Sequence, residues 1–328
     1  MVTAAWNSEG TLRDTMESVL AQVRRKGDGV GDGEGCVGDG VGFEVEHIVV
    51  DGGSSDGTMG IVRGMEGRYR EAGVLLKWVS ERDGGIYDAM NKGIGMATGD
   101  VVGLLNSDDF YSSEGVLARV AWEFTGGEPR LTPRHSGAGV GMVAGCMGNG
   151  TGMVAGEGGE MGKRNGGLDG VNGTGRVEEG GIDAVYGDVH YVDAGDLGRC
   201  VRRYSSKGFR RWKMRLGYMP AHPSFYCRRA VYGRLGLFDT DFRIAADFEQ
   251  LLRLIYINGI VARYVPMDFV TMRTGGASSS GLASHRRIIC EHMAAYRKNG
   301  VRSGWLHEGV RYLCKGTALV WHRVTGGL

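Results

Sequence analysis

Residues 101–110 read Val-Val-Gly-Leu-Leu-Asn-Ser-Asp-Asp-Phe, and this stretch decides the fold. Its first five residues are apolar or small, and a short apolar run that ends in turn residues is typical of a buried parallel strand. Asp108 and Asp109 follow, where two adjacent carboxylates repel each other and resist burial. A divalent cation such as Mg²⁺ or Mn²⁺, which prefers oxygen ligands, would remove that repulsion. The stretch alone indicates either a metal site or an acidic turn in water.

The segments before this stretch alternate between strand and helix. Apolar runs predict strands at 1–5, 46–50 and 74–79, and apolar residues at helical spacing predict helices at 11–25, about 57–71 and 86–97. This alternation predicts a parallel sheet covered by helices, with the carboxyl ends of the strands at one edge, where ligands bind. The loops at that edge are 6–8, 51–54, 81–83 and 106–109. They are acidic and glycine-rich, so a bound cation would make the edge a metal–nucleotide site.

Two other nucleotide-binding folds are excluded by their missing motifs. A dinucleotide-binding unit requires Gly-x-Gly-x-x-Gly directly after the first strand, but residues 6–10 read Trp-Asn-Ser-Glu-Gly. The chain also lacks the Gly-x-x-x-x-Gly-Lys-Ser/Thr stretch of a P-loop.

Composition narrows the class of protein further. The 328 residues carry a formal net charge of +1, which argues against nucleic acid as the main partner. The six cysteines are widely spaced and form no Cys-x-x-Cys pair, as expected of reduced thiols in a cytosolic protein. No uninterrupted apolar run approaches 18 residues, and the chain opens without the basic segment of a signal peptide. We therefore expect a cytoplasmic protein without a transmembrane helix.

Glycine is unevenly distributed. Of the 60 glycines, eight lie in 27–42 and twenty in 126–181. Such segments bury too little apolar surface to offset their backbone entropy, so both are predicted to be flexible insertions in surface loops. The predicted organisation is one α/β domain over 1–281 with these insertions, followed by a helical extension over 282–328.

An ordered set of motifs resembles a known family. The motifs are Thr3–Ser8, Val50–Thr58, Ser80–Gly93, Ala97–Asp100, Leu104–Asp109, Tyr186–Asp188, His222–Phe225 and Gly236–Glu249. Their order and spacing over about 1–125 and 183–281 resemble the family 2 glycosyltransferases, especially bacterial-type enzymes that build capsule, exopolysaccharide and lipid-linked oligosaccharides. The resemblance implies the GT-A fold, with a Rossmann-like, mostly parallel sheet, helices on both faces and added C-terminal helices.

The resemblance also implies an activity. The enzyme would move one sugar from a nucleotide-diphosphate sugar, usually a UDP-sugar, to a hydroxyl of a saccharide or polyprenyl-linked acceptor, with inversion. The Gln-x-x-Arg-Trp motif of the processive members is absent, which favours single transfer. Two alternatives are a nucleotidyltransferase, whose Gly-x-Gly-Thr/Ser-Arg signature after the first strand is missing, and a non-catalytic sugar-nucleotide-binding homologue.

On the donor side, the resemblance assigns nucleotide contacts to six positions and metal binding to two, of which one is shared. The nucleotide-binding residues would be Ala5, Asn7, Asp51, Asp83, Asn91 and Asp108. Mn²⁺ or Mg²⁺ would be bound by Asp109 and Asp108. Asn106 stands where many relatives have aspartate, so the number of protein ligands is open. Asp51 has a simpler interpretation as a turn residue that ends its strand.

On the acceptor side, the residue that matches the family's general base is Asp247, which would take the proton of the acceptor hydroxyl. A helix cap is the alternative role for an aspartate near a helix start. His222 and Glu249 are assigned to the acceptor side, and Arg273 to the leaving diphosphate. The alternatives are a structural histidine and a solvated surface arginine. Residues 185–189 are predicted to return to the sheet as a strand.

The C-terminal region 284–323 is predicted to be helical, with basic residues beside apolar positions. A basic amphipathic helix is suited to lie on a membrane surface. The alternative is a helix that packs on the domain.

Overall fold

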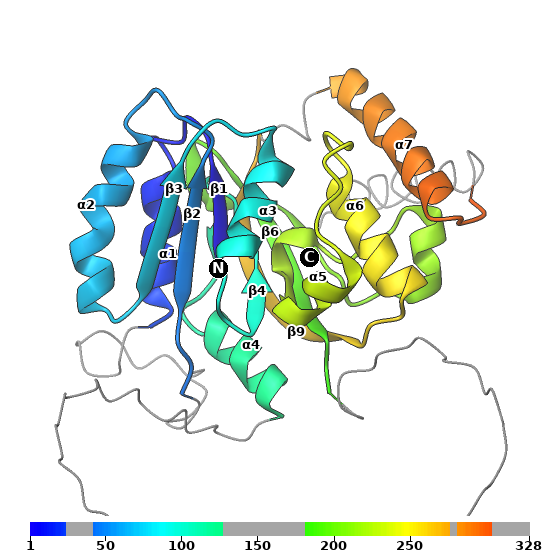
Figure 1. Cartoon of the computed structure of the whole chain (residues 1–328), viewed down its shortest axis with the longest axis horizontal. Coiled ribbons are helices and arrows are strands. Elements are labelled where there is room, and N and C mark those ends of the chain that lie inside the picture. Colours follow the sequence, from blue (N-terminus) through cyan, green and yellow to red (C-terminus); the bar gives the residue numbers. More distant parts are fainter. Residues whose placement is uncertain (24–41, 127–180, 276–280, 304–328) are drawn as a thin grey trace, which may run out of the picture. The chain divides into compact units, whose positions relative to one another are not determined.

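The computed structural model describes residues 1–23, 42–126, 181–275 and 281–303 of the chain (Figure 1). These residues belong to one compact unit. The insertions predicted at 27–42 and 126–181 lie, apart from their end residues, outside the described part, and so does 304–328. No helix among the described residues is both long enough and apolar enough to cross a membrane.

The first half of the domain has the predicted alternation of strand and helix. Its elements are β1 (Val2–Ala5), α1 (Leu12–Ala21), β2 (Glu46–Asp51), α2 (Thr58–Glu71), β3 (Leu75–Ser80) and α3 (Ile86–Met96). The strands pair in parallel in the order β1-β2-β3. The carboxyl ends of these strands therefore share one edge of the sheet, as predicted.

The stretch that decides the fold lies beside β1. Leu104, just after β4 (Val101–Gly103), forms a parallel bridge to Val2, and the N–H of Leu105 donates to the carbonyl of Val2 at 3.0 Å. Residues 106–109 thereby reach the same sheet edge as the loops after β1 and β2.

The second half of the sheet is mixed rather than parallel. The strands are β5 (Phe110–Tyr111), β6 (Ala184–Asp193), β7 (Asp196–Tyr204), β8 (Phe225–Arg228) and β9 (Ala262–Arg273). Their order from β4 is β4-β8-β6-β9-β5, with β7 paired to β6. Both pairings of β8 are antiparallel, so β6 runs parallel to β4, and the predicted return of 185–189 to the sheet is confirmed.

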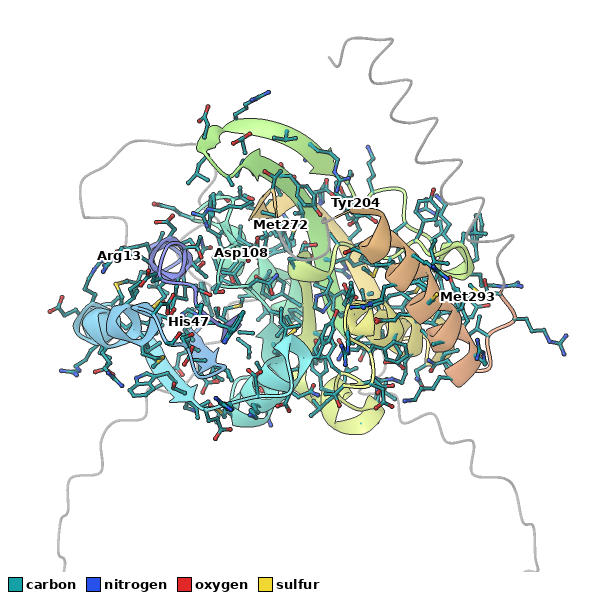
Figure 2. The ribbon with its side chains drawn as sticks, turned by 90° about the horizontal axis from the view of Figure 1, so that it is seen from above. Arg13, His47, Asp108, Tyr204, Met272 and Met293 are labelled. Carbon is teal, nitrogen blue, oxygen red and sulfur yellow. The ribbon has the colours of Figure 1, made fainter. Side chains whose placement is uncertain are left out.

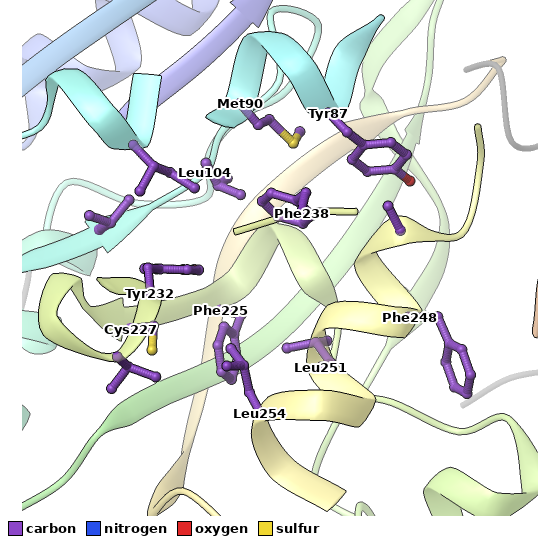
Figure 3. Packing of buried hydrophobic residues seen from close by; sticks show 14 of the residues in the cluster. Tyr87, Met90, Leu104, Phe225, Cys227, Tyr232, Phe238, Phe248, Leu251 and Leu254 are labelled. Atoms are coloured by element: carbon purple, nitrogen blue, oxygen red, sulfur yellow. The ribbon is translucent and has the colours of Figure 1, made fainter. Parts of the chain in front are cut away.

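Helices cover both faces, because neighbouring residues of a strand point to opposite sides. Ile48 and Val50 pack in one core with α3, whereas Val49 packs in a second core with α1 and α2. The second core also contains α4 (Val116–Thr125), and the first contains residues of α5 (Arg229–Leu235) and α6 (Ala246–Leu251) (Figure 3). This three-layer arrangement confirms the predicted α/β architecture.

Short irregular helices surround α6. They are the 3₁₀ helices η1 (Arg211–Leu216) and η2 (His222–Ser224) and the π-helix η3 (Leu252–Ile257) that continues α6.

The described part of the C-terminal extension is packed on the domain. Helix α7 (Gly281–Lys298) lies beside α6 (Figure 1), and the rings of His292 and Phe248 stack with centroids 3.8 Å apart. The Tyr296 hydroxyl donates to the carbonyl of Met214 in η1 at 2.7 Å. One side of α7 is therefore occupied by the protein itself.

Candidate active site

Hydrogen bonds join the loops at the carboxyl edge of the sheet. Asn7 follows β1 in a left-handed backbone conformation, with φ at 47°, which asparagine tolerates better than most residues. Its N–H donates to Ser54 Oγ at 2.7 Å, and its Oδ1 accepts from the N–H of Ser55 at 3.0 Å. The hydroxyls of Ser8 and Ser107 are 2.8 Å apart. The loops after β1, β2 and β4 thus form one connected rim.

Asp51, the last residue of β2, is fully buried and organises this rim. Its carboxylate accepts from the N–H and hydroxyl of Ser54, and from Ser80 Oγ at 2.6 Å. The next residue, Gly52, donates its N–H to the carbonyl of Ala5 at 2.9 Å. Asp51 therefore does serve as a turn residue, and its predicted nucleotide contact stays a prediction.

The loop after β3 lies directly against the loop after β2. A Cβ added to Gly52 would stand 2.7 Å from Asp83 Oδ2, so the Asp83 carboxylate lies close against the main chain of Gly52. Asp83 Oδ1 accepts from the N–H of Gly85 at 2.9 Å, which fixes the turn before α3. The structure thus brings Asp83 to the same rim as Asp51 and Asn7.

Asp109 is the buried carboxylate of the acidic loop, with 1% of its surface exposed. Asn106 Nδ2 donates to its Oδ2 at 3.0 Å, but its Oδ1 has no hydrogen-bond partner among the described residues. Burial, together with the neighbouring Asp108, raises the pKa of Asp109 well above its usual value. An unpartnered buried carboxylate oxygen requires a proton or a cation.

The acidic loop fits a divalent cation that also binds a diphosphate. Within the described ranges, no group of three or more histidine, cysteine, aspartate or glutamate residues could hold a metal ion. Mg²⁺-type ions are commonly bound by one or two carboxylates together with substrate phosphates. Asp108 and Asp109 match that donor set, whereas the Asn106 amide is already engaged with Asp109.

Arg273, the last residue of β9, is placed on the acidic loop. One guanidinium nitrogen donates to the carbonyl of Asp108 at 2.6 Å, another to the carboxylate of Asp14, and the group lies 5.1 Å from the centroid of the Phe110 ring. Figure 2 shows Asp108 in this region, between α1 and the end of β9. The predicted partner of the diphosphate therefore lies beside the predicted metal ligands.

Asp247 lies in the first turn of α6, and its Oδ1 accepts from the N–H of Phe248 at 2.8 Å. Burial raises the pKa of Asp247 to about 6; the hydrogen bonds to it and the phenol of Tyr87 oppose this effect, and Glu291 adds to it. Such a carboxylate is ionised at neutral pH but is a stronger base than an exposed aspartate, as a proton acceptor should be.

Two residues that support Asp247 were missed in the sequence. Tyr87, at the start of α3, donates its hydroxyl to the carbonyl of Ile244 at 2.6 Å, in the turn before α6. Glu291 of α7 accepts from the N–H groups of Ile244 and Ala245 at 2.9 and 2.8 Å. The sequence feature that could have indicated Glu291 is that it is the sole acidic residue between Asp268 and Glu308.

Aromatic rings connect Tyr87 to the predicted acceptor side. The Tyr87 and Phe238 rings (Figure 3) stack with centroids 5.5 Å apart. The His222 ring meets the Phe238 ring edge-on, also at 5.5 Å. Burial lowers the pKa of His222 to about 4, so its ring is neutral at pH 7. His222 thus has the packing role of a structural histidine, and its acceptor contact stays a prediction.

Asn91 and Glu249 are engaged within the protein. The Asn91 amide exchanges two hydrogen bonds of 2.9 Å with the main chain of Phe238. Glu249 is buried, pairs with Arg253 at 3.1 Å and accepts from Asn299 Nδ2 at 3.1 Å. Both side chains thus help to hold α3, α6 and the end of α7 in place. Their predicted substrate contacts stay predictions.

Comparisons with known proteins show which family and which fold the chain is similar to. The family model described as "Glycosyl transferase family 2" matches residues 1–129. An uncharacterized glycosyltransferase of Mycobacterium tuberculosis is 35% identical over 129 residues, which cover 39% of this chain and 40% of that protein. A PGL/p-HBAD biosynthesis glycosyltransferase of Mycobacterium bovis is 37% identical over 78 residues, which cover 24% of this chain and 29% of that protein. The chain thus spans less than half the length of these relatives.

A solved structure shares the fold. The structure of S. aureus TarS 1-349 in complex with UDP-GlcNAc superposes with a TM-score of 0.50 at 16% identity, covering 88% of this chain and 65% of that one. With the sheet and helices described above, this likeness confirms the GT-A fold. Residues 1–129 of the chain are therefore similar to glycosyl transferase family 2.

Proposed function

We propose that the protein is an inverting, metal-dependent glycosyltransferase that moves one sugar from a nucleotide-diphosphate sugar to an acceptor hydroxyl. The observation that carries the proposal is the path of the chain from Asp83 to Tyr87. Asp83 lies on the rim with Asp51, and Tyr87 packs beside Asp247. This short turn supports a site in which the donor and acceptor groups lie near each other.

The donor end is suited to a leaving diphosphate. Asp108 and Asp109 would hold Mn²⁺ or Mg²⁺, which supplies charge stabilisation for the diphosphate. Arg273 lies against the same loop with its positive charge. The TarS complex contains UDP-GlcNAc, which supports a nucleotide-sugar donor for this chain, and a UDP-sugar is our choice. Ala5, Asn7, Asp51, Asp83 and Asn91 would complete the donor contacts.

The acceptor end supplies a base. The ionised Asp247 takes the proton of the acceptor hydroxyl as its oxygen attacks the anomeric carbon, and the diphosphate leaves from the opposite face. One displacement inverts the configuration, so an α-linked donor gives a β-glycoside. The acceptor would be a saccharide or a polyprenyl-linked acceptor.

The proposed location is the cytoplasm, with contact to the inner face of the membrane. That contact was predicted for the C-terminal helices. In α7, His292, Ala295 and Tyr296 are buried against the domain, so only the other side of this helix is open to a membrane. The remaining residues of the prediction, 304–323, lie outside the described residues.

A donor-hydrolysis screen tests the proposal. UDP-, GDP- and dTDP-sugars are incubated with the protein and Mn²⁺, and release of the nucleoside diphosphate is measured with and without EDTA. We expect metal-dependent release from one donor class, and expect Asp247→Asn to lose sugar transfer while keeping nucleotide binding. Metal-dependent nucleotide binding without turnover of any donor would instead identify a non-catalytic sugar-nucleotide-binding protein. Absence of both would refute the proposal.

A further inference from the structure

Positive charge is concentrated in one part of an almost neutral chain. The formal net charge of the protein is +1, yet eleven arginine and lysine residues and no acidic residue lie between Asp196 and Asp239. Five neighbouring residues within this run define what we call the η1 surface: Lys207, Arg210, Arg211, Trp212 and Lys213. Four of them are exposed and Lys213 is partly exposed.

The cations of the η1 surface are not neutralised by the protein. Arg210 donates to the carbonyl of Phe209 at 2.9 Å, Arg211 to that of Tyr256 at 3.1 Å, and Lys213 to that of Gly208 at 2.6 Å. None of the four cations forms an ion pair with a carboxylate in the described part of the chain. These bonds to neutral carbonyls fix the side chains but leave their charges to attract an external anion.

An aromatic side chain accompanies the cations. Trp212 is 59% exposed and lines an open groove of about 510 Å³ with Arg210, Arg211 and Tyr256. An indole with one apolar face and one polar edge is favoured where water meets lipid headgroups. The lining has no carboxylate or amide side chain to accept hydrogen bonds from sugar hydroxyls. The groove therefore suits phosphate headgroups better than a polysaccharide.

The end of the described C-terminal region contacts η1 beside this surface. Arg215 of η1 donates to the carbonyl of Arg302 at 2.7 Å, and Ser303 Oγ donates to the carbonyl of Arg215 at 2.7 Å. The sequence that follows contains Trp305 and Trp321, three arginine or lysine residues and a single acid. A second basic and aromatic sequence thus begins beside η1.

We propose that the η1 surface docks on a membrane whose surface carries anionic lipid headgroups. Each lysine or arginine near such a surface favours binding, and the exposed indole adds an interfacial contact. The inference rests on the membrane contact of the proposed function and specifies it, because it assigns that contact to η1 in addition to the C-terminal helices. It concerns no donor or acceptor residue.

Co-sedimentation of the full chain with large vesicles tests this inference. The vesicles are pure phosphatidylcholine or a 70:30 mixture with phosphatidylglycerol. The test variant reverses two charges, Arg210→Glu with Lys213→Glu. The matched control reverses two exposed arginines of α2, Arg63→Glu with Arg70→Glu, and so has the same net charge. Thermal unfolding and nucleotide binding are measured for each protein to show that the variants are folded.

We expect binding to the anionic vesicles that weakens with salt, and little binding to the neutral ones. The η1 variant should lose at least about tenfold in partition coefficient, with a much smaller loss in the α2 control. Trp212→Ala should weaken binding that remains at high salt. Equal losses in the two double variants, or equal binding to both vesicle types, would overturn the proposal. So would binding of soluble alginate without binding to vesicles, which would identify a site for an acidic polysaccharide. Donor turnover is a separate readout, so a failure here leaves the proposed function standing.

Discussion

The carboxyl group of Asp247 predicts how the rate of sugar transfer changes with pH. Burial raises the pKa of Asp247 to about 6, and the base is active only when ionised. Because the pKa is raised, the active form accumulates as the pH rises through 6. The ionised fraction is about 9% at pH 5 and about 91% at pH 7, so the rate of the chemical step should rise roughly tenfold between these values.

The assay is single-turnover transfer at saturating donor, metal and acceptor, from pH 4.5 to 8 at constant ionic strength. Nucleotide affinity is measured over the same range, so that weaker donor binding is not mistaken for loss of the base. An exposed aspartate would already be ionised at pH 5 and would give an almost flat profile. A flat profile between pH 5 and 7, or a rate that falls with pH, would refute Asp247 as a buried general base.

Three further results are expected. Glu291→Gln keeps an oxygen for the turn before α6 but removes a negative charge that raises the pKa of Asp247, so the midpoint of the same pH profile should move to lower pH; an unmoved midpoint would show that Glu291 does not act on the base. Asp109→Asn should weaken UDP binding at least about tenfold in Mn²⁺ but little in EDTA, by titration calorimetry, and an equal loss in both would exclude a metal role. In Gly93→Ala the new methyl would stand 2.2 Å from a side-chain carbon of Val2 in β1. The free energy of unfolding, measured in urea, should therefore fall by about 1–3 kcal/mol. The control Gly95→Ala, whose new methyl meets nothing within 4 Å, should lose no stability.

Much of the fold could be predicted because its first half is built from local patterns. The three parallel strands and their helices have the periodicity of βα units, and the loops at the sheet edge follow from topology alone. The second half of the fold was harder to predict from the sequence. Strand β5 has two residues, and η1 and η2 are short 3₁₀ helices, so none of them has enough residues to show a period.

The proximity of the candidate site residues could be predicted for those that lie in loops following strands. Asn7, Asp51, Asp83, Asp108 and Asp109 follow strands whose ends meet, so their proximity was expected. Tyr87 and Glu291 support Asp247 through contacts between distant parts of the chain, and no local pattern indicates such a pairing. For the same reason, sequence alone did not reveal that the Asn91 amide bonds to the main chain of Phe238.

The direction of β6 has a practical consequence for engineering. Because β6 runs parallel to β4, the chain enters β2 and β6 at the edge opposite the loops of the candidate site. The two glycine-rich segments precede these two strands, after residue 23 and after residue 126. The described residues that flank both segments on their C-terminal side therefore enter the sheet at the edge remote from the candidate site. The two segments offer two independent positions for shortening, tagging or inserting a reporter domain without altering the donor loops.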